Sequence, residues 1–226
     1  MAPKPHLTVV GVAITWATIG LLVREVDLPA VAVAWGRVVI GAGGLGAWIV
    51  IRTRRRRGEA ARVGWNLRYR PGLTLASGAL LAVHWAAMFA AFQRAPIGSV
   101  LLIVYLAPVG VAAMAPRTLG ERVGPTVVAA LGLSVVGAAC VVGPGTGGIG
   151  GSALGLAGLA SVTYAAMVLV DKRLLADPTV DGLGLAWAKQ ATAAVVLAPF
   201  AVLARGGRLD GVVVAAGARP RPRRQG

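Results

Sequence analysis

The chain has 226 residues, of which 57% are hydrophobic and only 14% are charged, and its mean hydropathy is +0.75. Soluble domains have about 45 to 50% apolar and about 25% charged residues, so this composition excludes a soluble globular protein. The formal charge of +15 would suggest a nucleic-acid partner in a soluble protein, but the charges avoid most of the chain. We therefore expect an all-α integral membrane protein in a lipid bilayer, with no nucleic-acid partner, no metal and no cofactor.

Long apolar stretches between the charges predict the membrane spans. A crossing helix needs about 20 apolar residues. The glycine-rich segment 143–151 disfavours helix and divides the stretch 123–170 into two spans. We predict about seven transmembrane helices. They lie in residues 5–23, 28–51, 71–93, 95–116, twice within 123–170, and in 182–204.

The basic residues predict the orientation of these spans. Lysine and arginine in short loops favour the cytoplasmic side. With the N-terminus inside, the inner segments hold 13 basic residues, whereas the outer loops hold only Arg24 and Arg94. The run Arg54–Arg57 then serves as a topology anchor, with binding of nucleic acid or anionic lipid as the alternative. We predict a multi-pass protein of the cell membrane with a cytoplasmic N-terminus.

Two short patterns recur in the two halves of the chain. The segment Trp16–Arg24 has the same spacing from aromatic to basic residue as Tyr164–Lys172, and Ala34–Val38 is similar to Ala186–Gln190. Five predicted spans separate the copies, and an odd number inverts the second copy relative to the first. Inverted repeats are an architecture of secondary transporters. The pattern predicts one five-helix repeat followed by a partial, inverted second repeat.

A set of motif residues carries a family resemblance. They are Arg37, Ala107-Pro108-Val109, Leu119-Gly120-Glu121-Arg122, Gly132 and Gly137. With these residues the chain resembles the EamA-type permeases of the drug/metabolite transporter superfamily over about residues 8–205. The resemblance implies two inverted five-helix repeats that move amino acids, other metabolites or toxic compounds across the cytoplasmic membrane.

This chain departs from that pattern in its second half. We expect residues 1–143 to form the first repeat, 144–204 a partial second repeat, and 205–226 a basic and aberrant tail, as in a C-terminally truncated permease. The predicted function is alternating-access transport of a small metabolite, amino acid or drug-like compound, not an enzymatic reaction. The alternative is a non-transporting truncated membrane fragment that only associates with other helices. A homodimer is one assembly that we consider.

Two basic residues lie inside predicted spans. Arg37 and Lys189 occupy equivalent repeat positions, and we expect each about two turns into its span from the extracellular end. Charged side chains inside a membrane normally face protein or water. Arg37 and Lys189 could therefore hold an anionic substrate group such as a carboxylate. The alternative is that they reach the outer interface or tie the repeats together.

Aromatic residues near the middle of the predicted spans are further candidates. His84 and Trp85 lie too deep for the interfacial aromatic belt, although helix packing is the alternative role for such residues. Pro108 lacks an N–H, which frees the carbonyl of Val104 and predicts a kink beside the cavity. The full set of predicted cavity residues is Trp16, Arg37, His84, Trp85, Tyr105 and Lys189.

Acidic residues are absent from every predicted span. Proton coupling through a carboxylate therefore has no predicted carrier, and His84 is the one side chain in the spans that ordinarily titrates near neutral pH. We expect Glu121 to contact Arg117 or Arg122 in a cytoplasmic loop.

Overall fold

The computed structural model describes residues 28–55, 70–142 and 149–205. The first predicted span, at 5–23, most of the glycine-rich segment, and nearly all of the basic tail lie outside the described residues. The described part consists of helices. They are α2 (Ala30–Arg55), α3 (Pro71–Phe92), α4 (Ile97–Val104), α5 (Ala107–Thr118), α6 (Pro125–Val142), α7 (Gly151–Leu175) and α8 (Gly182–Arg205).

The helices follow the predicted spans closely. Five segments of the described chain are long and apolar enough to cross a membrane, namely α2, α3, the α4–α5 pair, α7 and α8. A helix satisfies its own backbone N–H and C=O groups, which a bilayer cannot do. The shorter apolar helix α6 corresponds to the fifth predicted span. The all-helical membrane architecture is confirmed, whereas the count of seven spans and the repeat arrangement stay predictions.

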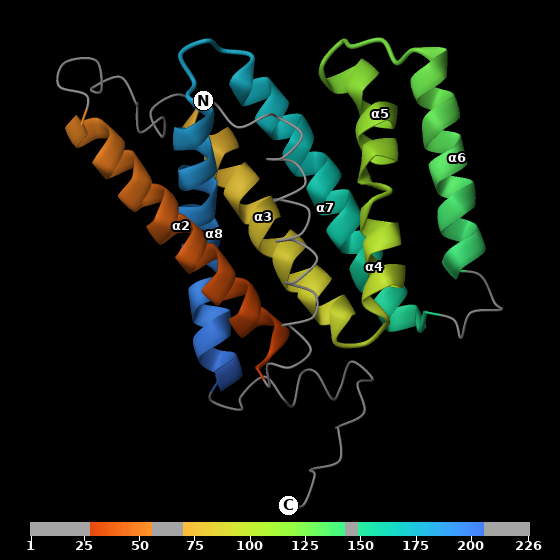
Figure 1. Cartoon of the computed structure of the whole chain (residues 1–226), viewed down its shortest axis with the longest axis horizontal. Coiled ribbons are helices and arrows are strands. Elements are labelled where there is room, and N and C mark those ends of the chain that lie inside the picture. Colours follow the sequence, from red (N-terminus) through yellow and green to blue (C-terminus); the bar gives the residue numbers. More distant parts are fainter. Residues whose placement is uncertain (1–27, 56–69, 143–148, 206–226) are drawn as a thin grey trace, which may run out of the picture.

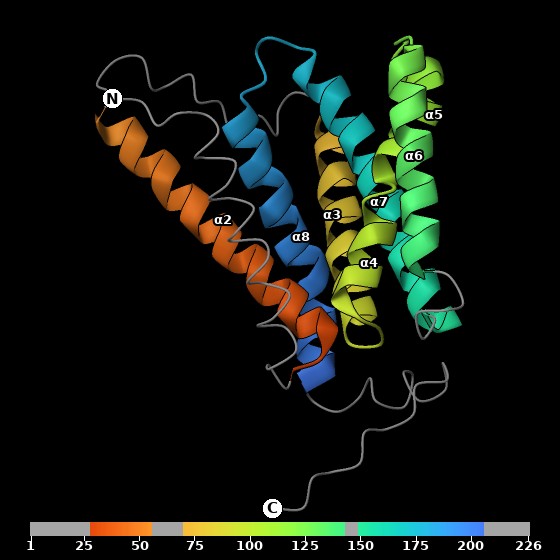
Figure 2. The ribbon, with the colours of Figure 1, turned by 45° about the vertical axis from the view of Figure 1, so that its right-hand side comes forward.

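The helices form a bundle with α3 and α7 at its centre (Figure 1). On one side α8 packs against α3 and α2, and on the other side α4 and α5 pack against α7. Helix α6 lies at the edge of the bundle beyond α4 and α5 in Figure 1, and the turned view of Figure 2 brings it in front of α5. The core of the described chain is therefore the contact of α3 with its neighbours, and the candidate site residues of α3 lie within it.

Small residues set the distance between α2 and α8. A Cβ atom at Gly41 would lie 2.6 Å from the Gln190 amide nitrogen, and one at Gly46 would lie 3.0 Å from the Trp187 indole nitrogen. Glycine at such positions lets two membrane helices approach closely. The residue numbers rise along α2 while those of their partners fall along α8, so the two helices are antiparallel.

The central pair α3 and α7 combines large and small side chains. Phe89 of α3 is 1% exposed, and α7 contributes Ala157 and Ala160, both 0% exposed. Alanines on α7 leave room for the rings of α3, so the two helices can pack closely along their contact. This packing fixes the rotation of α3 and thereby the direction of its polar side chains.

Candidate functional site

A stack of aromatic rings runs along the buried face of α3. The ring centroids of His84 and Trp85 are 5.1 Å apart. Phe89 follows Trp85 at 5.4 Å, and Phe92 follows Phe89 at 6.0 Å. Tyr164 of α7 lies on the other side of His84 at 5.2 Å. Aromatic pairs at these separations attract one another, so α3 and α7 present one continuous aromatic wall.

The guanidinium of Arg37 lies against this wall. Its Cζ atom is 3.7 Å from the centroid of the Trp85 ring, and Trp85 is 5% exposed. A desolvated contact of this kind contributes about 2 kcal/mol. Three of the predicted site residues, Arg37, His84 and Trp85, therefore lie together inside the bundle.

His84 is held in one orientation by the backbone of α7. The side chain is 3% exposed, and its Nδ1 atom lies 2.8 Å from the carbonyl oxygen of Ala160. Because a carbonyl oxygen only accepts, Nδ1 carries the hydrogen and donates it. In the neutral ring Nε2 is then the acceptor nitrogen.

Sequence reasoning missed Tyr164 as a site residue. The available signal was its alignment with Trp16 in the internal repeat, since Trp16 was among the predicted cavity residues. Trp16 itself lies outside the described residues.

The fourth span is interrupted beside Pro108. The turn at Tyr105 and Leu106 separates α4 from α5, and the hydroxyl of Ser161 on α7 donates to the carbonyl oxygen of Val104 at 3.4 Å. A neighbouring helix thus satisfies the carbonyl that proline cannot bond. Tyr105 departs from its predicted place: it is 61% exposed and lies outside the aromatic stack. The break turns Tyr105 outward, whereas Val104 before it stays buried.

A polar triad links three helices at the other end of α3. The Lys189 Nζ of α8 lies 2.5 Å from Oδ2 of Asp171 on α7, and the Ser77 hydroxyl of α3 donates to Oδ1 at 2.5 Å. The side chains of Lys189 and Asp171 are only 19% and 16% exposed, and Ser77 is fully buried. Both carboxylate oxygens are therefore engaged, each by a different helix.

Two sequence predictions are wrong at this triad. No acidic residue was expected inside a span, but α7 continues to Leu175 and includes Asp171. Lys189 was expected near the extracellular end, level with Arg37. Because α8 is antiparallel to α2, equal distances from the two helix starts place Lys189 toward the opposite end of the bundle. Its partner Ser77 precedes Trp85 by eight residues, about 12 Å along a helix.

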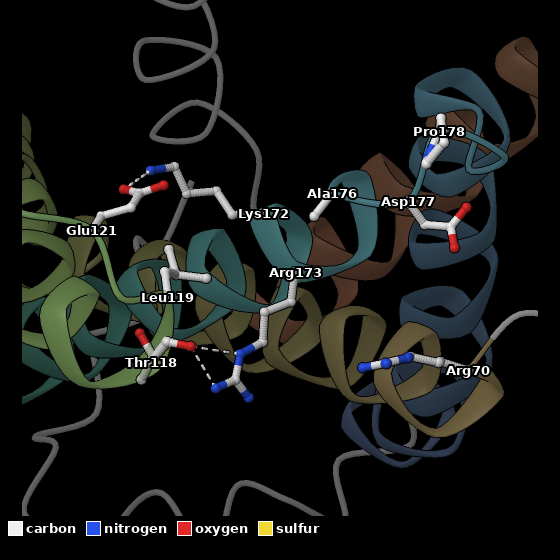
Figure 3. Close-up of a pocket in the computed structure, with 9 residues that line it drawn as sticks. All are labelled: Arg70, Thr118, Leu119, Glu121, Lys172, Arg173, Ala176, Asp177 and Pro178. Atoms are coloured by element: carbon white, nitrogen blue, oxygen red, sulfur yellow. Dashed lines mark hydrogen bonds and ion pairs between the residues drawn. The ribbon is translucent and has the colours of Figure 1, made fainter.

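Near this triad, a pocket of about 500 Å³ opens where α5 ends and α7 ends (Figure 3). Lys172 pairs with Glu121 at 2.6 Å, and the Arg173 guanidinium donates to the carbonyl oxygen of Thr118 at 2.6 and 3.0 Å. The predicted contact of Glu121 with an arginine of its own loop is therefore replaced by an ion pair to α7. The remaining lining residues are Arg70, Leu119, Ala176, Asp177 and Pro178.

The long apolar helices define a multi-pass membrane protein, with charged and polar side chains held inside its bundle. A sequence model of the EamA-like transporter family matches residues 3–143, which is more than half of the chain. The chain belongs to this family, which confirms the resemblance seen in its motifs. Members are membrane transporters of the drug/metabolite transporter superfamily and not enzymes. No curated protein and no solved structure matches the chain.

Proposed function

We propose that this protein moves a small metabolite with an anionic group, such as an amino acid, across the cell membrane by alternating access. One observation carries the proposal: in a chain of a transporter family, the Arg37 guanidinium lies inside the helix bundle against the Trp85 ring. An arginine in a membrane span costs about 2.5 to 3.5 kcal/mol on insertion scales, so a function is the default explanation for it.

The chemistry of Arg37 favours a carboxylate-bearing substrate. A guanidinium binds an aromatic ring with its face and a carboxylate with its edge, where the N–H groups form a planar fork. Arg37 can therefore bind a carboxylate without leaving Trp85. His84 and Tyr164 extend the same wall and would contact the organic part of the substrate.

The distribution of charge supports the proposed orientation. We define the basic end of the bundle as the end where α2, α5 and α7 finish and where α3, α6 and α8 begin. Among the basic residues in the described loops, only Arg94 lies at the opposite end, where Arg205 is the last residue of α8. We assign the basic end to the cytoplasm, which implies a cytoplasmic N-terminus for a first span at 5–23. The basic end carries Arg52, Arg54, Arg70, Arg117, Arg122, Lys172 and Arg173.

Reciprocal contacts between α2 and α8 support the proposed inverted repeat. The Trp35 indole donates to the carbonyl oxygen of Ala194 at 3.1 Å, and the side chain of its repeat equivalent, Trp187, lies against Gly46. Each helix thus packs a tryptophan side chain against the other helix, as elements related by a two-fold axis do. In this proposal, rocking of residues 1–143 against 144–204 exposes the Arg37 site to either side.

The variant Arg37→Ala tests the site. We expect the KM for uptake of a carboxylate substrate to rise about 10- to 100-fold, because a charge-assisted hydrogen bond contributes about 1.5 to 3 kcal/mol. The measurement is uptake of radiolabelled amino acids and dicarboxylates into liposomes that contain the full chain. Arg94→Ala is the matched control, since Arg94 is exposed and its guanidinium donates to the carbonyl oxygen of Ala90, four residues earlier in the chain. Equal KM values for Arg37→Ala and wild type would remove Arg37 from the site.

A further inference from the structure

The Ser77–Asp171–Lys189 triad has no part in the proposed substrate site. It lies at the basic end, one turn before the end of α7 and about two turns after the start of α8. Its three members come from three helices that pack together there, because Gly78 allows α8 to approach α3 until a Cβ would meet the Lys189 carbonyl oxygen at 3.0 Å. The triad therefore joins the helices that must separate if the bundle opens at this end.

Separation of these helices has an electrostatic cost. Asp171 and Lys189 form a pair with little exposure, and pulling a buried pair apart leaves each charge without compensation in a poorly solvated place. The Ser77 hydroxyl adds a second bond to the carboxylate across the α3–α7 contact. Opening becomes cheaper if one of the two charges is first neutralised.

We propose that Asp171 is a proton-binding site of this transporter, and that its protonation breaks the triad and opens the bundle at the basic end. The proposal rests on the proposed transport function and names its coupling ion. The proton from the adjacent water adds to a carboxylate oxygen, and the neutral carboxyl group no longer holds Lys189. Lys189 keeps its charge and can extend its four-carbon side chain toward the water at the start of α8.

The surroundings of Asp171 allow this exchange. Its side chain is 16% exposed, which gives protons access from the basic end. Its sequence neighbours Lys172 and Arg173 are directed to Glu121 and to the Thr118 carbonyl (Figure 3). Lys189 is thus the cation that contacts the carboxylate. The other titratable or charged groups on the helices packed against α7 are Arg70 and His84 of α3 and Arg117 of α5.

Distances between spin labels measure the opening directly and need no substrate. Labels on Leu75→Cys of α3 and Leu175→Cys of α7 lie across the Ser77–Asp171 contact, and both parent residues are about half exposed. Cys140→Ser removes the single native thiol. The full chain is placed in lipid nanodiscs and titrated from about pH 8 to about pH 2, a range that extends well below the ordinary pKa of an aspartic acid side chain, about 3.9. We expect a longer distance to gain population as the pH falls.

Variants assign this transition to the triad. Asp171→Asn should show the longer distance at every pH. Ser77→Ala should keep the transition but raise the population of the longer distance, because the hydroxyl bond to Asp171 holds α3 against α7. Glu121→Gln is the matched control: it removes the more exposed ion pair at the same end and should behave as wild type.

Two results would overturn the proposal. One is a wild-type distance that does not respond to pH, and the other is a pH response that survives in Asp171→Asn. Failure of the transport function itself has a different signature. In that case none of the radiolabelled amino acids and dicarboxylates enters the liposomes, whatever the spin labels show. Uptake together with a spin-label distance that does not depend on pH rejects the proton site alone.

Discussion

Lys189→Met is expected to lower the free energy of unfolding by about 3 kcal/mol, the largest effect of any single substitution considered, because it leaves a buried carboxylate without its cation. Asp171 has a shorter side chain than lysine and cannot move its charge far toward the solvent, so without Lys189 it stays charged with no cation beside it or takes up a proton. Asp171→Asn should cost less, since Lys189 can extend to the solvent. Equilibrium unfolding in mixed detergent micelles gives these values.

The double variant Asp171→Asn with Lys189→Met is the control for this prediction. It removes both charges and keeps an amide that can accept from Ser77. We expect it to recover most of the stability lost in Lys189→Met, since removing a buried pair together costs little. If the losses of the two single variants simply added in the double variant, the ion pair would contribute no coupling and the expected stability role would be wrong.

Gly78→Val is the second substitution with a large expected effect. A Cβ at this position would lie 2.4 Å from the Thr192 Cβ and 3.0 Å from the Lys189 carbonyl oxygen, so α3 and α8 must move apart. Overpacking of this kind costs about 1 to 3 kcal/mol, which we expect as a lower midpoint of thermal unfolding in detergent. Gly72→Val tests the same change on the same helix, where no atom lies within 4 Å of the added Cβ. Equal midpoints for the two variants would contradict the close approach of α3 and α8.

Hydropathy predicted the helices because the bilayer imposes a length and an apolar composition on each span. The interruption near Pro108 was also visible in the sequence, since a missing N–H is a local property. Of the predicted site, Arg37, His84 and Trp85 do lie together. Arg37 lies in the second predicted span, and His84 and Trp85 lie in the third. Their positions along these two spans alone predicted a similar depth in the bilayer.

The triad could not be predicted in the same way. Asp171 is followed by Lys172 and Arg173, so a search for uncharged stretches ended the sixth span at Val170, directly before Asp171 and five residues before the end of α7. The contact of Asp171 with Ser77 joins residues 94 positions apart and depends on how α3 and α7 are rotated. Neither the rotation of a helix nor its neighbours follows from hydropathy. Lys189 was misplaced because its depth was counted from the helix start without reversing the direction of α8.

Counterflow is the sharpest test of transport by alternating access. Liposomes with the full chain are loaded with an unlabelled amino acid or dicarboxylate from the uptake assay. They are then diluted into a trace of the same compound in labelled form. We expect transient accumulation of label above its equilibrium level, because a carrier returns loaded and exchanges one molecule for another. The accumulation should be weakened in Arg37→Ala and preserved in Arg94→Ala. If every labelled amino acid and dicarboxylate equilibrated no faster than in protein-free liposomes, alternating-access transport would be ruled out and the chain would be a non-transporting membrane protein.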